Sequence, residues 1–89
     1  MRQYMTVNAL SEETGISKDT IRKWIREMRE CDRYDADTTF FGGGRTTLVR
    51  TVCLLDYSKY RQDLQSPVLS KYVPELKTLE VERKMGVAT

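Results

Sequence analysis

Residues 17–29 constrain the fold more than any other part of the chain. Their apolar side chains recur at positions i, i+3, i+4 and i+7: Ile21, Trp24, Ile25 and Met28. At 100° per residue, this spacing places all four in one sector of an α-helix. The segment is therefore predicted to be an amphipathic helix that begins after Ser17, ends near Arg29 and turns its apolar stripe, Trp24 included, toward a core.

A shorter helix is predicted before this one. Thr6 is suited to cap it, because its hydroxyl can accept from an N–H group of the first turn. Gly15 is suited to end it, because glycine readily adopts the left-handed conformation. Ser17 then caps the next helix, and Ser11 is a small residue where the helices would cross. Two short helices joined by such a turn form a helix-turn-helix, whose second helix enters the major groove of DNA.

Charge is unevenly distributed along the chain. The 89 residues include 15 basic and 13 acidic side chains, a net charge of +2, which alone does not indicate a nucleic-acid partner. Residues 18–29 contain five basic and two acidic residues, whereas residues 30–37 contain one basic and four acidic residues. A basic helix followed by an acidic connector implies a polarised surface. A merely solvated helix face would give the same pattern, but the preceding helix favours DNA binding.

Two β-prone runs, residues 38–41 and 46–50, flank a cluster of glycines at 42–44. This pattern predicts a β-hairpin. A hairpin that follows a DNA-contacting helix acts as a wing along the backbone or the minor groove. Arg45 at the tip and Arg50 on the return strand are then expected to meet phosphates or a narrow groove. The alternative is an ordinary hairpin whose glycines only permit the turn.

The exposed start of the second helix is expected to select the DNA sequence. Arginine paired with guanine is the commonest specific contact, so Lys18, Arg22 and Lys23 are the main candidates for base contacts. Asp19 either accepts from a cytosine amine or, as we favour, stabilises the positive end of the helix dipole. The candidate helix residues are Ser17, Lys18, Asp19, Thr20, Arg22, Lys23 and Arg26. The candidate hairpin residues are Gly43, Gly44, Arg45, Thr46 and Arg50.

The composition argues against an enzyme or a metal site. The sequence has no histidine, and its two cysteines, Cys31 and Cys53, form no CxxC pair. The commonest general base is therefore missing, and a four-ligand zinc site cannot be assembled. We expect no catalytic residues, cofactor or metal. No apolar run approaches the roughly 20 residues of a membrane helix, and the N-terminus lacks a signal-peptide core. A cytoplasmic protein without membrane contact is expected.

Residues 6–24 resemble the helix-turn-helix of the MerR family. The run Thr14-Gly15-Ile16-Ser17, followed by Thr20-Ile21-Arg22, matches the family pattern T-G-[IV]-S-x-x-T-[IL]-R. The hairpin and a predicted helix over residues 51–64, which Thr51 could cap, extend the likeness. Over residues 5–64 the chain is similar to excisionases, small winged-helix proteins of phages, plasmids and conjugative elements. The resemblance implies a protein that binds and bends DNA and directs a recombinase toward excision.

The predicted fold is mainly α with a small β-hairpin wing, a winged helix-turn-helix over residues 1–65. Residues 66–89 are a C-terminal tail interrupted by Pro67 and Pro74. Within the tail, residues 74–85 can form a last helix with proline in its first turn. The alternatives are a disordered tail, or one that becomes ordered against a second copy or an enzyme partner.

The leading functional hypothesis is sequence-specific binding of double-stranded DNA by an excisionase, or recombination directionality factor, of a mobile element. Its expected partners are DNA, a site-specific recombinase and further copies of itself on DNA, in a bacterial or phage-infected cell. One alternative is a small MerR-like transcriptional regulator with no recombinase partner. A second alternative is a protein–protein adaptor that uses the winged-helix scaffold, with the acidic connector and the tail as its contact surface.

Overall fold

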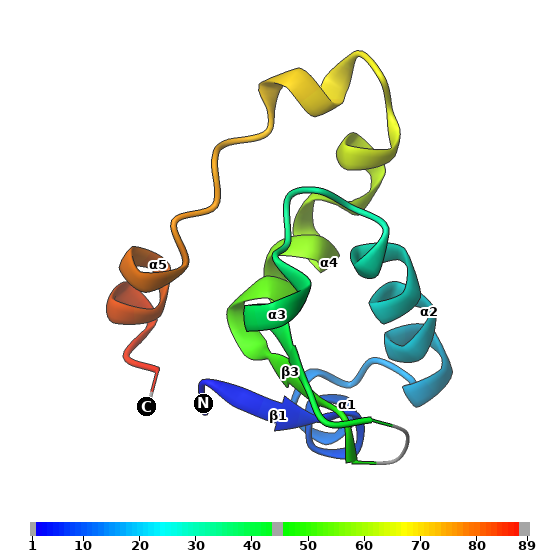
Figure 1. Cartoon of the computed structure of the whole chain (residues 1–89), viewed down its shortest axis with the longest axis vertical. Coiled ribbons are helices and arrows are strands. Elements are labelled where there is room, and N and C mark those ends of the chain that lie inside the picture. Colours follow the sequence, from blue (N-terminus) through cyan, green and yellow to red (C-terminus); the bar gives the residue numbers. More distant parts are fainter. Residues whose placement is uncertain (1, 44–45, 88–89) are drawn as a thin grey trace.

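The chain is mainly helical and includes a three-stranded antiparallel sheet (Figure 1). The computed structural model describes residues 2–43 and 46–87. In chain order the elements are β1 (Tyr4–Thr6), α1 (Val7–Thr14), α2 (Lys18–Arg29), α3 (Ala36–Thr39), β2 (Phe40–Phe41), β3 (Leu48–Arg50), α4 (Thr51–Gln65), the short 3-10 helix η2 (Leu69–Tyr72) and α5 (Thr78–Met85). Among the described residues, no helix combines the length and the apolarity needed to cross a membrane.

The first two helices begin and end at the residues that their local signals predict. Thr6 accepts a hydrogen bond from the backbone N–H of Ala9 at 3.1 Å, and Ser17 accepts one from the N–H of Thr20 at 3.2 Å. Both hydroxyls thereby satisfy a donor that a helix start leaves without a backbone partner. Gly15 ends α1 in the left-handed region at φ 77°. The predictions for both helices and their caps are confirmed.

The turn between α1 and α2 is closed by side chains of α1. Ser11 donates from its hydroxyl to the carbonyl of Ile16 at 2.6 Å. The hydroxyl of Thr14 accepts from the N–H of Ile16 at 3.2 Å and donates to the carbonyl of Leu10 at 2.6 Å. Ser11, predicted as a small residue where the two helices cross, also fixes the path of the turn through this hydrogen bond.

The predicted hairpin is present, but its strands are shorter than expected and a third strand joins them. β2 and β3 pair antiparallel, with Phe41 opposite Leu48. Residues 38–39 belong instead to α3, because Asp35 caps that helix by accepting from the N–H of Asp37 at 3.0 Å. β1, which the sequence pattern does not predict, pairs with the other side of β3, so that the sheet order is β1-β3-β2.

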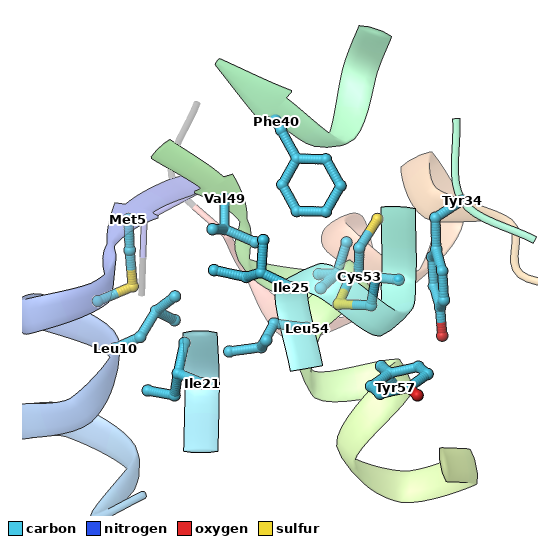
Figure 2. Packing of buried hydrophobic residues seen from close by; sticks show 12 residues of the cluster. Met5, Leu10, Ile21, Ile25, Tyr34, Phe40, Val49, Cys53, Leu54 and Tyr57 are labelled. Atoms are coloured by element: carbon cyan, nitrogen blue, oxygen red, sulfur yellow. The ribbon is translucent and has the colours of Figure 1, made fainter. Parts of the chain in front are cut away.

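The core lies between α1, α2, α4 and the inner face of the sheet. Figure 2 shows Leu10, Ile21 and Leu54 pointing toward one another from these three helices; all three are fully buried. The predicted stripe of α2 forms a large part of this core, although Trp24 is only half-buried and packs at its edge. Val49 reaches the core from β3.

α4 follows β3 without a loop, and this corrects the prediction that Thr51 caps it. The cap position is Arg50, which makes no side-chain capping hydrogen bond. Thr51 is the first helical residue, and its N–H donates to the carbonyl of Gln3 at 2.8 Å. Its buried hydroxyl has no hydrogen-bond partner among the described residues. The carbonyl of Gln3 therefore satisfies a backbone donor in the first turn of α4, where the prediction gave that role to a threonine side chain.

The tail forms a short helix that packs against the rest of the chain. α5 begins at Thr78, later than the prediction from Pro74. Its side chain Glu82 is buried and accepts a hydrogen bond from Nε of Arg50 at 2.6 Å and one from Nε2 of Gln3 at 3.2 Å. Val81 packs against the core as well. The tail thus covers the part of the sheet that carries Arg50.

Candidate nucleic-acid interface

The first turn of α2 presents the predicted contact residues to solvent. Ser17, Lys18 and Asp19 are exposed, whereas Thr20 is half-buried. The Ser17 hydroxyl donates to the Thr20 hydroxyl at 2.8 Å, in addition to capping the helix. Asp19 is the acidic residue of the first turn, where a negative charge is favoured by the helix dipole. Ser17 and Thr20 therefore have structural roles that leave Lys18 as the accessible cation of this turn.

The next two turns add three exposed cations, Arg22, Lys23 and Arg26. Arg22 lies 3.4 Å from a carboxylate oxygen of Asp19, but both side chains are largely in water, with exposed fractions of 54% and 97%. A surface pair of this kind contributes little. Lys23 and Arg26 form no ion pair with any of the described residues. The outer side of α2 is therefore a surface of accessible positive charge.

One flank of α2 lies beside the hairpin. The guanidinium of Arg29 stacks over the Phe40 ring of β2, with 4.5 Å from its carbon to the ring centroid. At 100° per residue, Lys18 and Arg22 each project within about 20° of Arg29, so they belong to the same flank. In Figure 1 the first turn of α2 and the strand ends that lead to the hairpin turn lie at the same lower end of the view.

The hairpin turn depends on Gly42, which belongs to the glycine cluster but is not among the candidate contact residues. Gly42 has φ 74°, and a Cβ added there would lie 3.0 Å from the carbonyl oxygen of Thr46. Gly43 and Thr46 are exposed, and the Thr46 hydroxyl donates to the carbonyl of Gly43 at 3.1 Å. These two predicted residues therefore close the turn. The predicted contacts Gly44 and Arg45 lie outside the described residues.

Arg50 does not lie where the prediction requires. It is buried, and its guanidinium pairs with Glu82 of α5 at 2.6 Å. In the strand it faces away from Val49 and the core, yet the tail covers that side of the sheet. The neighbouring carboxylate raises the pKa of Arg50 through a hydrogen bond. We therefore remove Arg50 from the candidate DNA contacts and assign it to the attachment of the tail.

The acidic connector is fastened to α4. Arg33 donates to the Asp56 carboxylate from Nε at 2.8 Å and from Nη2 at 3.0 Å, while the Tyr34 hydroxyl donates to it at 2.6 Å. Burial is the main cause that raises the pKa of Tyr34 far above its ordinary value. The connector that begins after α2 therefore holds the end of that helix near α4.

Glu27 is a residue of α2 whose role the sequence pattern does not reveal. Its carboxylate lies 3.0 Å from Nη2 of Arg61 on α4. The hydrogen bond from Arg61 holds the pKa of Glu27 below its ordinary value of 4.5. The two residues are 34 positions apart, so no local spacing in the sequence predicts that they meet.

Comparisons with known proteins identify no similar protein. No family model matches the chain, and no match was found among curated proteins or among solved structures. No group of three acidic, cysteine or histidine residues within the described segments is arranged to hold a metal ion.

Proposed function

We propose that the chain binds double-stranded DNA selectively as a winged helix-turn-helix protein. In this proposal α1 and α2 form the helix-turn-helix, α2 enters the major groove, and the β2–β3 hairpin is the wing. The observation that carries the proposal is the row of exposed cations on α2, Lys18, Arg22, Lys23 and Arg26, on a helix that adjoins the hairpin through Arg29 and Phe40.

The two kinds of contact have different tasks. Lysine and arginine that meet phosphates release counterions and provide most of the sequence-independent affinity. Base edges are read by hydrogen bonds in the major groove, where arginine pairs bidentately with guanine. Arg22 is our candidate for such a base contact, because its pairing with Asp19 is exposed and readily exchanged for one with DNA.

The first experiment is selection of bound duplexes from a random pool at two salt concentrations, for the wild type and for Arg22→Ala. We expect the wild type to enrich a motif. Arg22→Ala should lose about 1–3 kcal/mol of discrimination at one base pair. Lys71→Ala is the matched control, because Lys71 is an exposed cation of η2, outside α2. Failure of the wild type to enrich any duplex would favour the adaptor alternative.

A single module of this size covers little DNA, since small DNA-binding domains bury roughly 600–1,000 Å². We therefore propose that the natural sites are direct repeats or paired half-sites. Footprints on duplexes that carry one or two copies of the selected motif test this. Stronger protection of each copy in the doubled site is expected, whereas equal protection in both duplexes contradicts it.

The resemblance to excisionases makes a site-specific recombinase the proposed partner on DNA. The test is whether a recombinase encoded beside the gene is retained on the selected duplex only when this protein is present. Retention with a shift toward excision supports the role of a directionality factor. A change in transcription from the same site without such retention supports the MerR-like regulator instead.

A further inference from the structure

The Glu27 carboxylate is surrounded by donors from a single helix. Arg61 donates from Nη2 to Oε1 at 3.0 Å and from Nε to Oε2 at 3.3 Å. The Tyr57 hydroxyl donates to Oε2 at 3.2 Å, and Gln65 donates from Nε2 to Oε1 at 3.3 Å. Each oxygen of Glu27 thus accepts two hydrogen bonds from α4. We call this group of four residues the Glu27 clamp.

The clamp restricts rotation of α2 about its own axis. Tyr57, Arg61 and Gln65 are spaced four residues apart, so they form one stripe along α4. The Glu27 and Arg61 side chains are only 23% and 27% exposed. A bidentate guanidinium also fixes the direction of its carboxylate more closely than a single hydrogen bond does. The position of Glu27 around the α2 axis is therefore set by α4.

A second contact holds the opposite flank of the same helix turn. Arg29 stacks on Phe40 of β2. Two residues along a helix correspond to a rotation of about 200°, so Glu27 and Arg29 are held on nearly opposite sides. The last turns of α2 are fastened on both flanks, while the first turn buries Ile21 in the core and presents Lys18 to solvent.

We propose that Glu27, acting through Arg61, is a positioning residue for sequence reading. It touches no DNA, but it sets the direction in which the cations of α2 point. This inference rests on the proposed function. Removal of the Glu27 charge then has two effects of opposite sign. The attraction for any phosphate backbone increases, while the alignment needed for base contacts is lost.

The experiment compares Glu27→Gln with the wild type on two probes, the duplex that the wild type enriches and the unselected pool. We expect the variant to bind the pool at least as tightly as the wild type. We expect it to bind the enriched duplex more weakly, with the ratio of the two affinities falling about tenfold or more, as for the loss of one well-aligned base contact. A purely electrostatic role would strengthen both affinities equally. A purely structural role would weaken both.

Two further variants separate charge from geometry. Glu30→Gln removes the same charge at the end of α2, from an exposed side chain that makes no hydrogen bond with the described residues. It should leave the affinity ratio unchanged. Arg61→Lys keeps the charge but replaces the bidentate guanidinium with a single ammonium group. It should lower the ratio as Glu27→Gln does. The opposite outcome for either variant overturns the assignment.

A measurement without DNA checks the reorientation itself. Trp24 is the single tryptophan of the chain, and its ring meets Tyr57 edge-on with centroids 6.4 Å apart. Its fluorescence should change in Glu27→Gln and Arg61→Lys but not in Glu30→Gln. Unchanged emission in Glu27→Gln overturns the inference, as does an unchanged affinity ratio in a protein that still selects DNA. If the wild type selects no duplex, the proposed function fails and the positioning role fails with it.

Discussion

The local geometry at the start of α2 depends on single residues, either through an unusual backbone conformation or through a side-chain hydrogen bond. Gly15 ends α1 at a positive φ, and the hydroxyls of Ser11 and Thr14 close the turn. Such signals act within a few residues, which explains why the sequence predicts both helices and their caps. The burial of Arg50 beneath the tail has no local signal, because it depends on Glu82, 32 residues away.

Gly15→Ala is expected to lower the free energy of unfolding by about 1–2 kcal/mol, because a Cβ is disfavoured in the left-handed region. The cost is purely conformational, since an added Cβ would meet nothing within 4 Å. Gly43→Ala is the matched control: the site is equally open, but Gly43 does not have a positive φ. That variant should be neutral or more stable by up to about 1 kcal/mol. Urea unfolding of both variants measures the difference, and equal losses would contradict this explanation.

The Glu27 clamp is expected to make stability depend on pH. Arg61 lowers the pKa of Glu27 in the folded chain below its ordinary value of 4.5. Folding therefore favours the ionised form, and the resulting stabilisation is present above about pH 4.5 and lost as the pH falls through the lowered pKa.

The corresponding measurement is urea unfolding of the wild type and Glu27→Gln at a series of pH values. The wild type should be the more stable protein at pH 7, and the difference should shrink in acid. Other carboxylates titrate in both proteins, so the comparison isolates Glu27. If the difference in unfolding free energy between the two proteins stays constant as the pH falls, the Glu27 charge does not cause the difference.

At the scale of elements, the structure differs from the sequence prediction where pairing is non-local. β1 is three residues long and exists through its pairing with β3, with Met5 opposite Val49. α3 includes the first two residues of a predicted strand, since the Asp35 cap outweighs the β-preference of two threonines. The hairpin itself is predicted correctly, because two β-prone runs around glycines are a local signal.

Glu82→Ala is expected to detach α5 while α2 stays folded. Hydrogen bonds to charged groups contribute about 1.5–3 kcal/mol. Amides of α5 should therefore exchange roughly ten- to a hundredfold faster, since Arg50 would otherwise stay buried without its partner. Glu80→Ala, at an exposed position of the same helix, should leave the exchange unchanged. Hydrogen exchange measured by mass spectrometry reports both helices, and equal acceleration in α2 would contradict separate release of the tail.

Across the whole molecule, the distribution of charged side chains over the surface is more informative than the net charge. The net charge is only +2, yet two acidic groups are held in ion pairs across elements, Glu27 of α2 by Arg61 of α4 and Asp56 of α4 by Arg33 of the connector. The cations of the outer side of α2 remain exposed. The sequence predicts this polarity from the position of basic and acidic runs. It does not predict which acidic groups are neutralised, because their partners are distant in the chain.

The proposed DNA binding is expected to depend steeply on salt. Four exposed cations on α2 that displace counterions give a slope of log K against log salt of about −3 to −4. Lys23→Gln should make the slope shallower by about 0.9, whereas Lys84→Gln, at an exposed position of α5, should not change it. Fluorescence anisotropy titrations between about 50 and 200 mM salt measure these slopes. A slope near zero would contradict a phosphate-contacting surface.

The direct passage from β3 into α4 has a mechanical consequence. The hairpin, α4 and α2 are joined in series, since β3 and α4 share no intervening loop and α4 holds Glu27. If α2 enters the groove as proposed, a displacement of the hairpin is expected to be transmitted through α4 to α2, and the three elements would move as one body. A duplex whose grooves do not fit this body has to bend or twist, and the elastic energy of that adjustment falls on the nucleic acid. Base pairs that the protein never touches would then influence its affinity.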